Sequence, residues 1–207
     1  MNEDNLADVV ISIETELNVQ VGFLRGLLKE NDWSFLVKGH AFVEAAVSHA
    51  IVRTLEKPEL NGLITRLELG VHSTGKLAFA EALNVFGTPE RRFIRYLSKL
   101  RNDMVHDVSQ VDFDLKNYVK SLDQNQLKGF TQAFGYFAGD PKKKVSDSRG
   151  TKMSLSEFIT AEPKTAIWYS LMNFAGVAYL SPKLARNIDQ LKKITLALDP
   201  LRKLLSQ

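Results

Sequence analysis

Hydrophobic residues recur at three- and four-residue spacing along most of the chain, which is the pattern of amphipathic helices. The pattern is clearest near the N-terminus, between residues 9 and 28. Valine, isoleucine and threonine never alternate with polar residues for long enough to predict a sheet. The sequence therefore predicts an all-α fold, a helical bundle. Helices are expected at residues 9–28, 33–56, 63–69, 76–86, 88–104, 113–137 (one helix or two, interrupted near Asp123), 154–159, 164–180 and 183–205.

Capping residues and helix breakers set several of these boundaries. Asn31 and Asp32 precede the second helix, and Gly70 and Gly87 follow the third and fourth. The run Thr88-Pro89-Glu90 is typical of a cap followed by a proline in the first helical position. Ser181-Pro182 is interpreted in the same way, as the start of a last helix.

The chain divides into three parts. Residues 1–138 are expected to form the main helical domain, and residues 139–153 a basic loop. Residues 154–207 are expected to add C-terminal helices that pack on the same core. The loop is the clearest feature, because the stretch from Gly139 to Gly150 is rich in turn residues and lacks a helical pattern.

Composition excludes several classes of protein. The 207 residues are 44% hydrophobic and 25% charged, which excludes a disordered chain. Because cysteine is absent, a disulfide scaffold, a cysteine-based metal site and a thiol nucleophile are also excluded. The acidic N-terminus does not resemble a secretory signal. The longest apolar stretch, residues 167–180, is shorter than the roughly 20 residues of a membrane span, so we expect a cytoplasmic protein without membrane contact.

Charge is unevenly distributed along the chain. Residues 1–32 hold seven acidic and two basic side chains, a net charge of −5. Residues 91–106 and 142–152 each hold five basic side chains and one acidic side chain, a net charge of +4. Such a distribution permits an anionic partner, although solvated helix faces also explain such clusters.

One segment offers chemistry beyond packing, because it combines Arg101, Asn102 and His106 near the end of a helix. Four residues advance a helix by about 400°, so Asn102 and His106 lie on one face, where the amide can orient the imidazole. Arg101 lies about 140° away from His106, and its long side chain must bridge that angle. A guanidinium can bind two phosphate oxygens, and an imidazole titrates near neutral pH. The set is therefore suited to phosphodiester cleavage without a metal.

The run Arg101-Asn102-x-x-x-His106 resembles the R-x4–6-H motif of the HEPN superfamily. The segments before it are similar to those of the mannitol operon repressor family and its relatives. Those segments are a helix with a central acid, here Trp33 to Ile51 with Glu44, and then Ser73 to Leu83 with Lys76. The resemblance covers roughly residues 32–115.

The resemblance implies a HEPN-like bundle and a metal-independent endoribonuclease of toxin–antitoxin or phage-defence type. It implies a homodimer in which both motifs face one cleft, with RNA as substrate and an antitoxin or regulatory protein as partner. Arg101 would then stabilise the charge on phosphorus, His106 would act as general acid or base, and Asn102 would orient His106. Neither a cofactor nor a metal is expected.

Further residues are expected to support this site. Glu44 lies on a largely apolar helix and needs a cationic partner, either Lys76 or Arg101. Contacts to the RNA backbone are expected from Arg95, Lys99, Lys142, Lys143 and Lys144. His40 and Glu44, four residues apart, could form half of a metal site, but zinc needs three or four ligands and no second pair lies at a useful spacing.

The mannitol operon repressor branch implies an alternative, a non-catalytic regulatory or protein-interaction module in which the same residues are structural. This alternative expects Arg101 and His106 to be shielded and hydrogen-bonded to neighbours such as Glu44. It expects their loss to lower stability without any loss of activity. The residues alone leave both hypotheses open.

Overall fold

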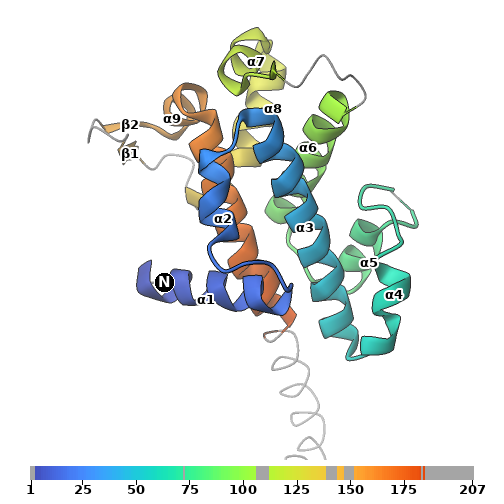
Figure 1. The fold of residues 1–207 in the computed structure, drawn as a ribbon. Coiled ribbons are helices and arrows are strands. Elements are labelled where there is room, and N and C mark those ends of the chain that lie inside the picture. The colour runs from blue at the N-terminus through green and yellow to red at the C-terminus, as the bar shows by residue number, and fades with distance from the viewer. Residues whose placement is uncertain are drawn as a thin grey trace, which may run out of the picture.

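A computed structural model of the chain describes residues 3–71, 73–105, 112–138, 144–146, 152–182 and 184. Helices hold most of these residues (Figure 1), which confirms the predicted all-α class. The elements are α1 (Glu3–Glu16), α2 (Phe23–Gly26), η1 (Leu27–Lys29), α3 (Asp32–Leu55), η2 (Pro58–Leu60), α4 (Asn61–Ile64), α5 (Lys76–Ala82), α6 (Thr88–Val105), α7 (Leu115–Ser121), α8 (Gln124–Phe134), η4 (Tyr136–Ala138), β1 (Lys144–Ser146), β2 (Lys152–Ser154) and α9 (Leu155–Ala161). Residues 163–182 form a further helix, here called the C-terminal helix.

Helix α3 lies at the centre of the bundle and packs against α4, α5 and α6. The Asn31 side chain caps its N-terminus by accepting a hydrogen bond from the Ser34 N–H at 2.7 Å. Among the described residues, α3 is the one helix long and apolar enough to cross a membrane, and 61% of that apolar window is buried inside the fold. A core helix meets the same criterion, so this feature is weak evidence for a membrane span.

Aromatic rings join α6 to α8 and to the C-terminal helix. The Phe93 ring centroid lies 5.9 Å from that of Phe134 and 5.7 Å from that of Phe174, and both distances are typical of aromatic pairs. All three side chains are fully buried. The buried residues of α9 and the C-terminal helix therefore belong to the same hydrophobic core as those of α3 and α6.

The prediction of one helix over residues 9–28 is wrong. Helix α1 ends at Glu16, and the chain turns through Asn18 and Gly22, both in the left-handed region with φ of 54° and 88°. The buried Glu14 carboxylate accepts hydrogen bonds from the N–H groups of Gly22 and Leu24, at 2.7 and 2.9 Å. This capping starts α2 in a new direction, although the apolar spacing continues across the break.

Two other expectations also need correction. Within the predicted basic loop, β1 and β2 form an antiparallel pair in which Val145 faces Met153. Each strand has three residues, which is too short for a pattern of alternation to be recognised in the sequence. Ser181 and Pro182 do not begin a new helix, since the C-terminal helix runs through both and Pro182 is buried. Of the predicted helix 183–205, all residues but Leu184 lie outside the described part of the chain.

Several boundaries are confirmed. Helices α3 and α6 begin and end within a few residues of their predicted limits. The interruption near Asp123 separates α7 from α8, because Asp123 forms a capping box with Gln126 at the start of α8.

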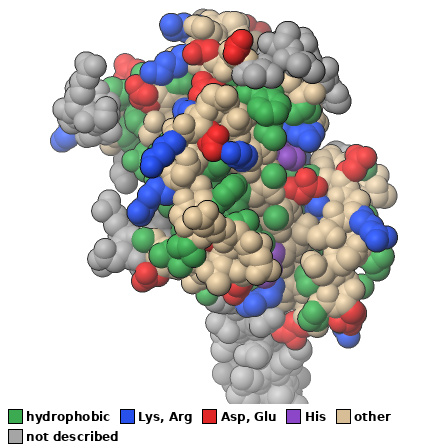
Figure 2. Space-filling view, viewed as in Figure 1, with side chains coloured by type: hydrophobic (Ala, Val, Ile, Leu, Met, Phe, Trp, Pro, Cys, Tyr) green, Lys and Arg blue, Asp and Glu red, His purple; other side chains and the backbone are tan. Residues whose placement is uncertain are grey.

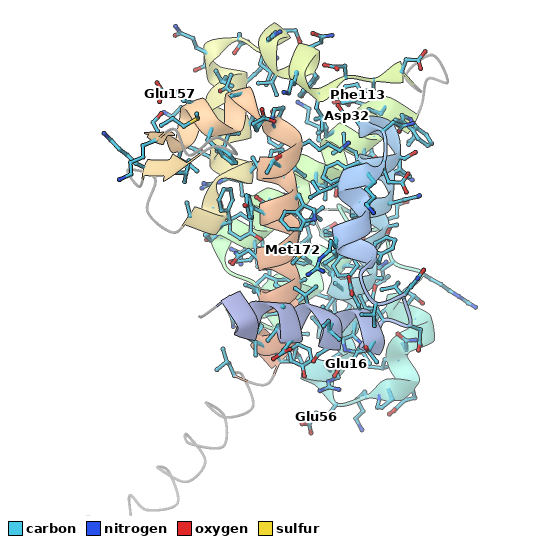
Figure 3. All side chains as sticks on the ribbon, turned by 60° about the vertical axis from the view of Figure 1, so that its left-hand side comes forward. Glu16, Asp32, Glu56, Phe113, Glu157 and Met172 are labelled. Atoms are coloured by element: carbon cyan, nitrogen blue, oxygen red, sulfur yellow. The ribbon has the colours of Figure 1, made fainter. Side chains whose placement is uncertain are left out.

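Asp32, at the start of α3, holds three elements together. Its Oδ1 lies 3.2 Å from Lys164 Nζ on the C-terminal helix, and its Oδ2 accepts a hydrogen bond from the Leu115 N–H at 2.8 Å. Figure 3 shows Asp32 near Phe113, which precedes α7. Lys164 also donates to the Glu30 carbonyl and lies over the Phe35 ring, 5.6 Å from its centroid.

We predict that Asp32→Ala lowers the free energy of unfolding by about 1–3 kcal/mol, because it removes a partly buried ion pair and the hydrogen bond to the first N–H of α7. Urea denaturation followed by circular dichroism measures the loss. Glu30→Gln is the matched control, since it removes only an exposed ion pair with Lys38 and should cost about 0–1 kcal/mol. Equal losses in the two variants would contradict a special role of Asp32.

Candidate functional site

Arg101 and Asn102 lie in the last turn of α6, side by side and in contact. The Arg101 guanidinium donates a hydrogen bond from Nη1 to Asn102 Oδ1 at 3.0 Å. Arg101 is half-buried and Asn102 is exposed. His106 lies outside the described residues, so the predicted contact between Asn102 and His106 stays a prediction.

The amphipathic pattern of α6 fixes where these side chains lie. Its buried face is turned toward the core, and its apolar members recur at helical spacing. They are Phe93, Ile94, Leu97, Leu100 and Met104. Ser98, Arg101 and Asn102 lie at one edge of this face, because residues three and four apart share a side of a helix.

At that edge the surface forms an open pocket of about 430 Å³, here called the α3–α6 pocket. Its walls come from α3, from α6 and from the segment between α4 and α5. The lining residues are His40, Glu44, Glu68, Leu69, Gly70, Val71, Ser98, Arg101 and Asn102. Figure 2 shows histidine, acidic and basic side chains together in the furrow beside the lobe of α4 and α5.

The Lys76 ammonium lies behind this pocket and pairs with Glu44. Lys76 Nζ donates to Glu44 Oε1 at 2.7 Å. The Lys76 side chain is 2% exposed, whereas the Glu44 side chain keeps 36% of its surface in water. Of the two partners expected for Glu44, the structure therefore has Lys76. Arg101, the other expected partner, does not pair with Glu44. No described carboxylate forms an ion pair with Arg101.

The pocket wall between α4 and α5 is held by its own backbone. The N–H groups of Gly75 and Lys76 donate to the carbonyls of Val71 and Glu68, at 3.0 and 2.9 Å. A Cβ atom on Gly75 would lie 2.6 Å from the Val71 oxygen and 2.7 Å from the Glu68 oxygen, so only glycine fits there. This close turn places Lys76 at the start of α5 with its side chain toward Glu44.

His40 and Ser98 form a buried polar contact at the pocket, and sequence reasoning missed its importance. His40 Nε2 lies 3.2 Å from Ser98 Oγ, and the two residues are only 7% and 9% exposed. Burial lowers the pKa of the His40 imidazole, the Glu44 charge opposes this shift, and the Arg101 and Lys76 charges lower the pKa further. His40 is therefore neutral at pH 7. The sequence signal that could have indicated this contact is the position of His40, a polar residue on the apolar face of α3.

The other predicted RNA-binding residues are not all close to the pocket. On an ideal helix Arg95 and Lys99 lie about 20° and 60° from Asn102, so both flank the pocket on α6, and both are exposed. Arg95 Nη2 also lies 3.7 Å from Glu81 Oε2. Lys144 lies in β1, which Figure 1 places beside α9 and away from α5. Lys142 and Lys143 lie outside the described residues.

A larger pocket of about 540 Å³ lies elsewhere, between α6, α8, α9 and the C-terminal helix. Gly135, Tyr136, Leu155 and Ile159 line it, together with Glu90 and Arg92 near the start of α6. None of the predicted site residues that the structure describes lines it. We take the smaller α3–α6 pocket as the candidate site, because buried polar groups and a guanidinium meet there.

The structure offers little to hold a metal. In the described ranges, no group of three or more histidine, aspartate, glutamate or cysteine side chains is arranged to bind an ion. His40 and Glu44 face the same pocket, but His40 contacts Ser98 and Glu44 contacts Lys76.

No known protein family, curated protein or solved structure matches the chain. The resemblance to the HEPN superfamily therefore stays a hypothesis carried by the Arg101 motif and by the order of the segments before it.

We predict that Glu44→Gln lowers the free energy of unfolding by about 3 kcal/mol, the lower end of the range for a broken buried pair, because Glu44 is partly in water while Lys76 is buried. Urea denaturation measures the loss. The double variant Glu44→Gln/Lys76→Met should recover most of it, since it removes the unpaired ammonium. A double variant less stable than Glu44→Gln alone would contradict this account.

Proposed function

We propose that the protein is a metal-independent endoribonuclease whose site consists of Arg101, Asn102 and His106, with Arg101 binding the scissile phosphate of RNA. The observation that supports this function most is the position of Arg101. Its guanidinium lines an open pocket, while Glu44, the acid that could have bound it, is paired with Lys76. A half-buried guanidinium in such a place is suited to a phosphate ligand.

The chemistry assigned to each residue follows from its groups. Arg101 would place two N–H donors on the phosphate oxygens and stabilise the additional negative charge of the transition state. Asn102 would orient His106, as the motif implies, and its hydrogen bond to Arg101 would hold the guanidinium in place. His106 would transfer a proton during attack by the ribose 2′-hydroxyl. The products would be a 2′,3′-cyclic phosphate and a 5′-hydroxyl.

The proposal includes the biological setting that the motif implies. We propose a cytoplasmic homodimer in which the two α6 ends face one cleft. It would act as a toxin or in phage defence, with an antitoxin or regulatory protein as partner. Arg95 and Lys99 would attract the RNA backbone beside the pocket, since both are exposed on α6.

The second candidate is a non-catalytic regulatory module of the mannitol operon repressor type. The ion pair between buried Lys76 and half-buried Glu44 favours it, because two of the supporting residues near the motif then serve the stability of the fold. In this case Arg101 would contribute to a protein contact or to stability, and RNA would remain intact.

We expect the purified protein to cleave structured RNA in the presence of EDTA and to leave cyclic phosphate ends. His106→Ala should reduce the rate by about 10²–10⁴-fold, because it removes a proton-transfer group. Arg101→Ala should reduce the rate by about 10²–10³-fold, because it removes a donor to the transition state. Gel electrophoresis and analysis of the product ends measure both effects.

Arg25→Ala is the control for Arg101→Ala. Arg25 is an exposed arginine on α2, and it neither lines the α3–α6 pocket nor lies on α6. It should leave cleavage unchanged, and thermal melts of both variants separate lost activity from lost folding. If the wild type and His106→Ala are equally inert at high protein concentration, the nuclease function is wrong and the regulatory candidate is favoured.

We also predict that Lys99→Ala and Arg95→Ala weaken RNA binding at low salt. Each removes a charge beside the pocket, so the slope of log affinity against log salt should become shallower by about 0.7 per lost phosphate contact for single-stranded RNA. Arg95→Ala should have the smaller effect, because Glu81 already compensates part of the Arg95 charge. Filter binding across a salt series measures both slopes. Lys120→Ala, on the exposed side of α7, is the control.

A further inference from the structure

Cleavage by a ribose 2′-hydroxyl requires two proton transfers. One group accepts the proton of the attacking hydroxyl, and another gives a proton to the leaving 5′-oxygen. The motif with Arg101 supplies one histidine, His106. The structure places a second histidine, His40, in the same pocket as Arg101 and Asn102.

The geometry links His40 to the phosphate-binding side chains through α6. Ser98 precedes Arg101 by three residues and Asn102 by four, so the three side chains share one side of the helix. Ser98 Oγ lies 3.2 Å from His40 Nε2. A hydroxyl backed by an imidazole therefore lies beside the guanidinium and the amide, and all four groups line the same pocket.

We infer that His40 is the proton acceptor for the attacking 2′-hydroxyl, with the Ser98 hydroxyl passing the proton to Nε2. The inference rests on the proposed nuclease function. In this step the 2′-oxygen forms a bond to phosphorus and gives its proton to Ser98 Oγ, which gives its own proton to His40. The bond from phosphorus to the 5′-oxygen breaks, and that oxygen takes a proton from His106.

The charges around His40 suit this role. It faces Glu44 on its own helix, Arg101 on α6 and Lys76 on α5, and Glu68 lies on the far wall of the pocket. Burial and the two cations keep the imidazole neutral and able to accept a proton, which is the state that the pKa shift indicates. Once His40 is protonated, the Glu44 carboxylate four residues along α3 stabilises the imidazolium.

The role of His40 predicts a specific change in the pH profile. The wild-type rate should rise from low pH as His40 loses its proton, and this rise should occur below the usual pKa of histidine. His40→Gln should remove the rise and reduce the rate at pH 7 by about 10²–10⁴-fold. Ser98→Ala should reduce the rate in the same direction, and it changes the packing by only one oxygen atom.

The decisive experiment compares normal RNA with a substrate whose leaving 5′-oxygen is replaced by sulfur. A thiolate leaves without a proton, so loss of the proton donor no longer matters with this substrate. We expect the sulfur substrate to restore cleavage by His106→Gln but not by His40→Gln. The reverse pattern, or wild-type activity of His40→Gln on normal RNA, would overturn the role of His40 and leave the nuclease function standing. An inert wild type would overturn both.

His49→Gln is the matched control. His49 lies on the same helix, nine residues after His40, and its Nε2 contacts Glu16 at 2.7 Å instead of any pocket residue. It should keep the wild-type rate and pH profile. Thermal melts of the four variants show whether each is folded at the assay temperature.

Discussion

A buried lysine ammonium is tolerated only beside a counter-charge, and the Lys76–Glu44 pair is the contact on which the site depends. The pair joins the first residue of α5 to the middle of α3. Lys76 is also joined to the pocket wall of Glu68 to Val71, because its N–H donates to the Glu68 carbonyl. Because Glu44 is paired with Lys76, it forms no ion pair with the Arg101 guanidinium, which lines the same pocket.

The sequence predicted best those parts of the fold that follow from local spacing. Helices α3 and α6 have long apolar stripes and clear caps, so their bounds could be read from the residues alone. The break after Glu16 could not, because it depends on the Glu14 carboxylate capping Gly22 and Leu24 across a turn. The apolar residues keep their helical spacing through that turn, so the sequence alone predicts a single helix. The two strands are too short to leave any pattern.

The candidate site also has a part that local spacing predicts and a part that depends on distant residues. Arg101 and Asn102 are neighbours in the chain, so the sequence alone places them close together, and a hydrogen bond joins their side chains. The contact of His40 with Ser98 joins residues 58 positions apart, so no spacing rule could have found it. The grouping of Lys144 with the pocket residues rested on charge alone, and charge does not say on which side of the bundle a strand packs.

The pocket itself carries little net charge, which says how RNA would be held there. Glu44 and Glu68 balance Lys76 and Arg101, so the pocket cannot attract a polyanion from a distance. In the proposed nuclease, that attraction would come from the exposed side of α6, where Lys99 and Arg95 lie. The balance of charges in the pocket also affects His40, because excess negative charge there would raise the pKa of its imidazole. The proposed capture of RNA and the proposed proton transfer thus need different charge environments, a basic surface for the first and a charge-balanced pocket for the second. Two sides of α6 would contribute to them.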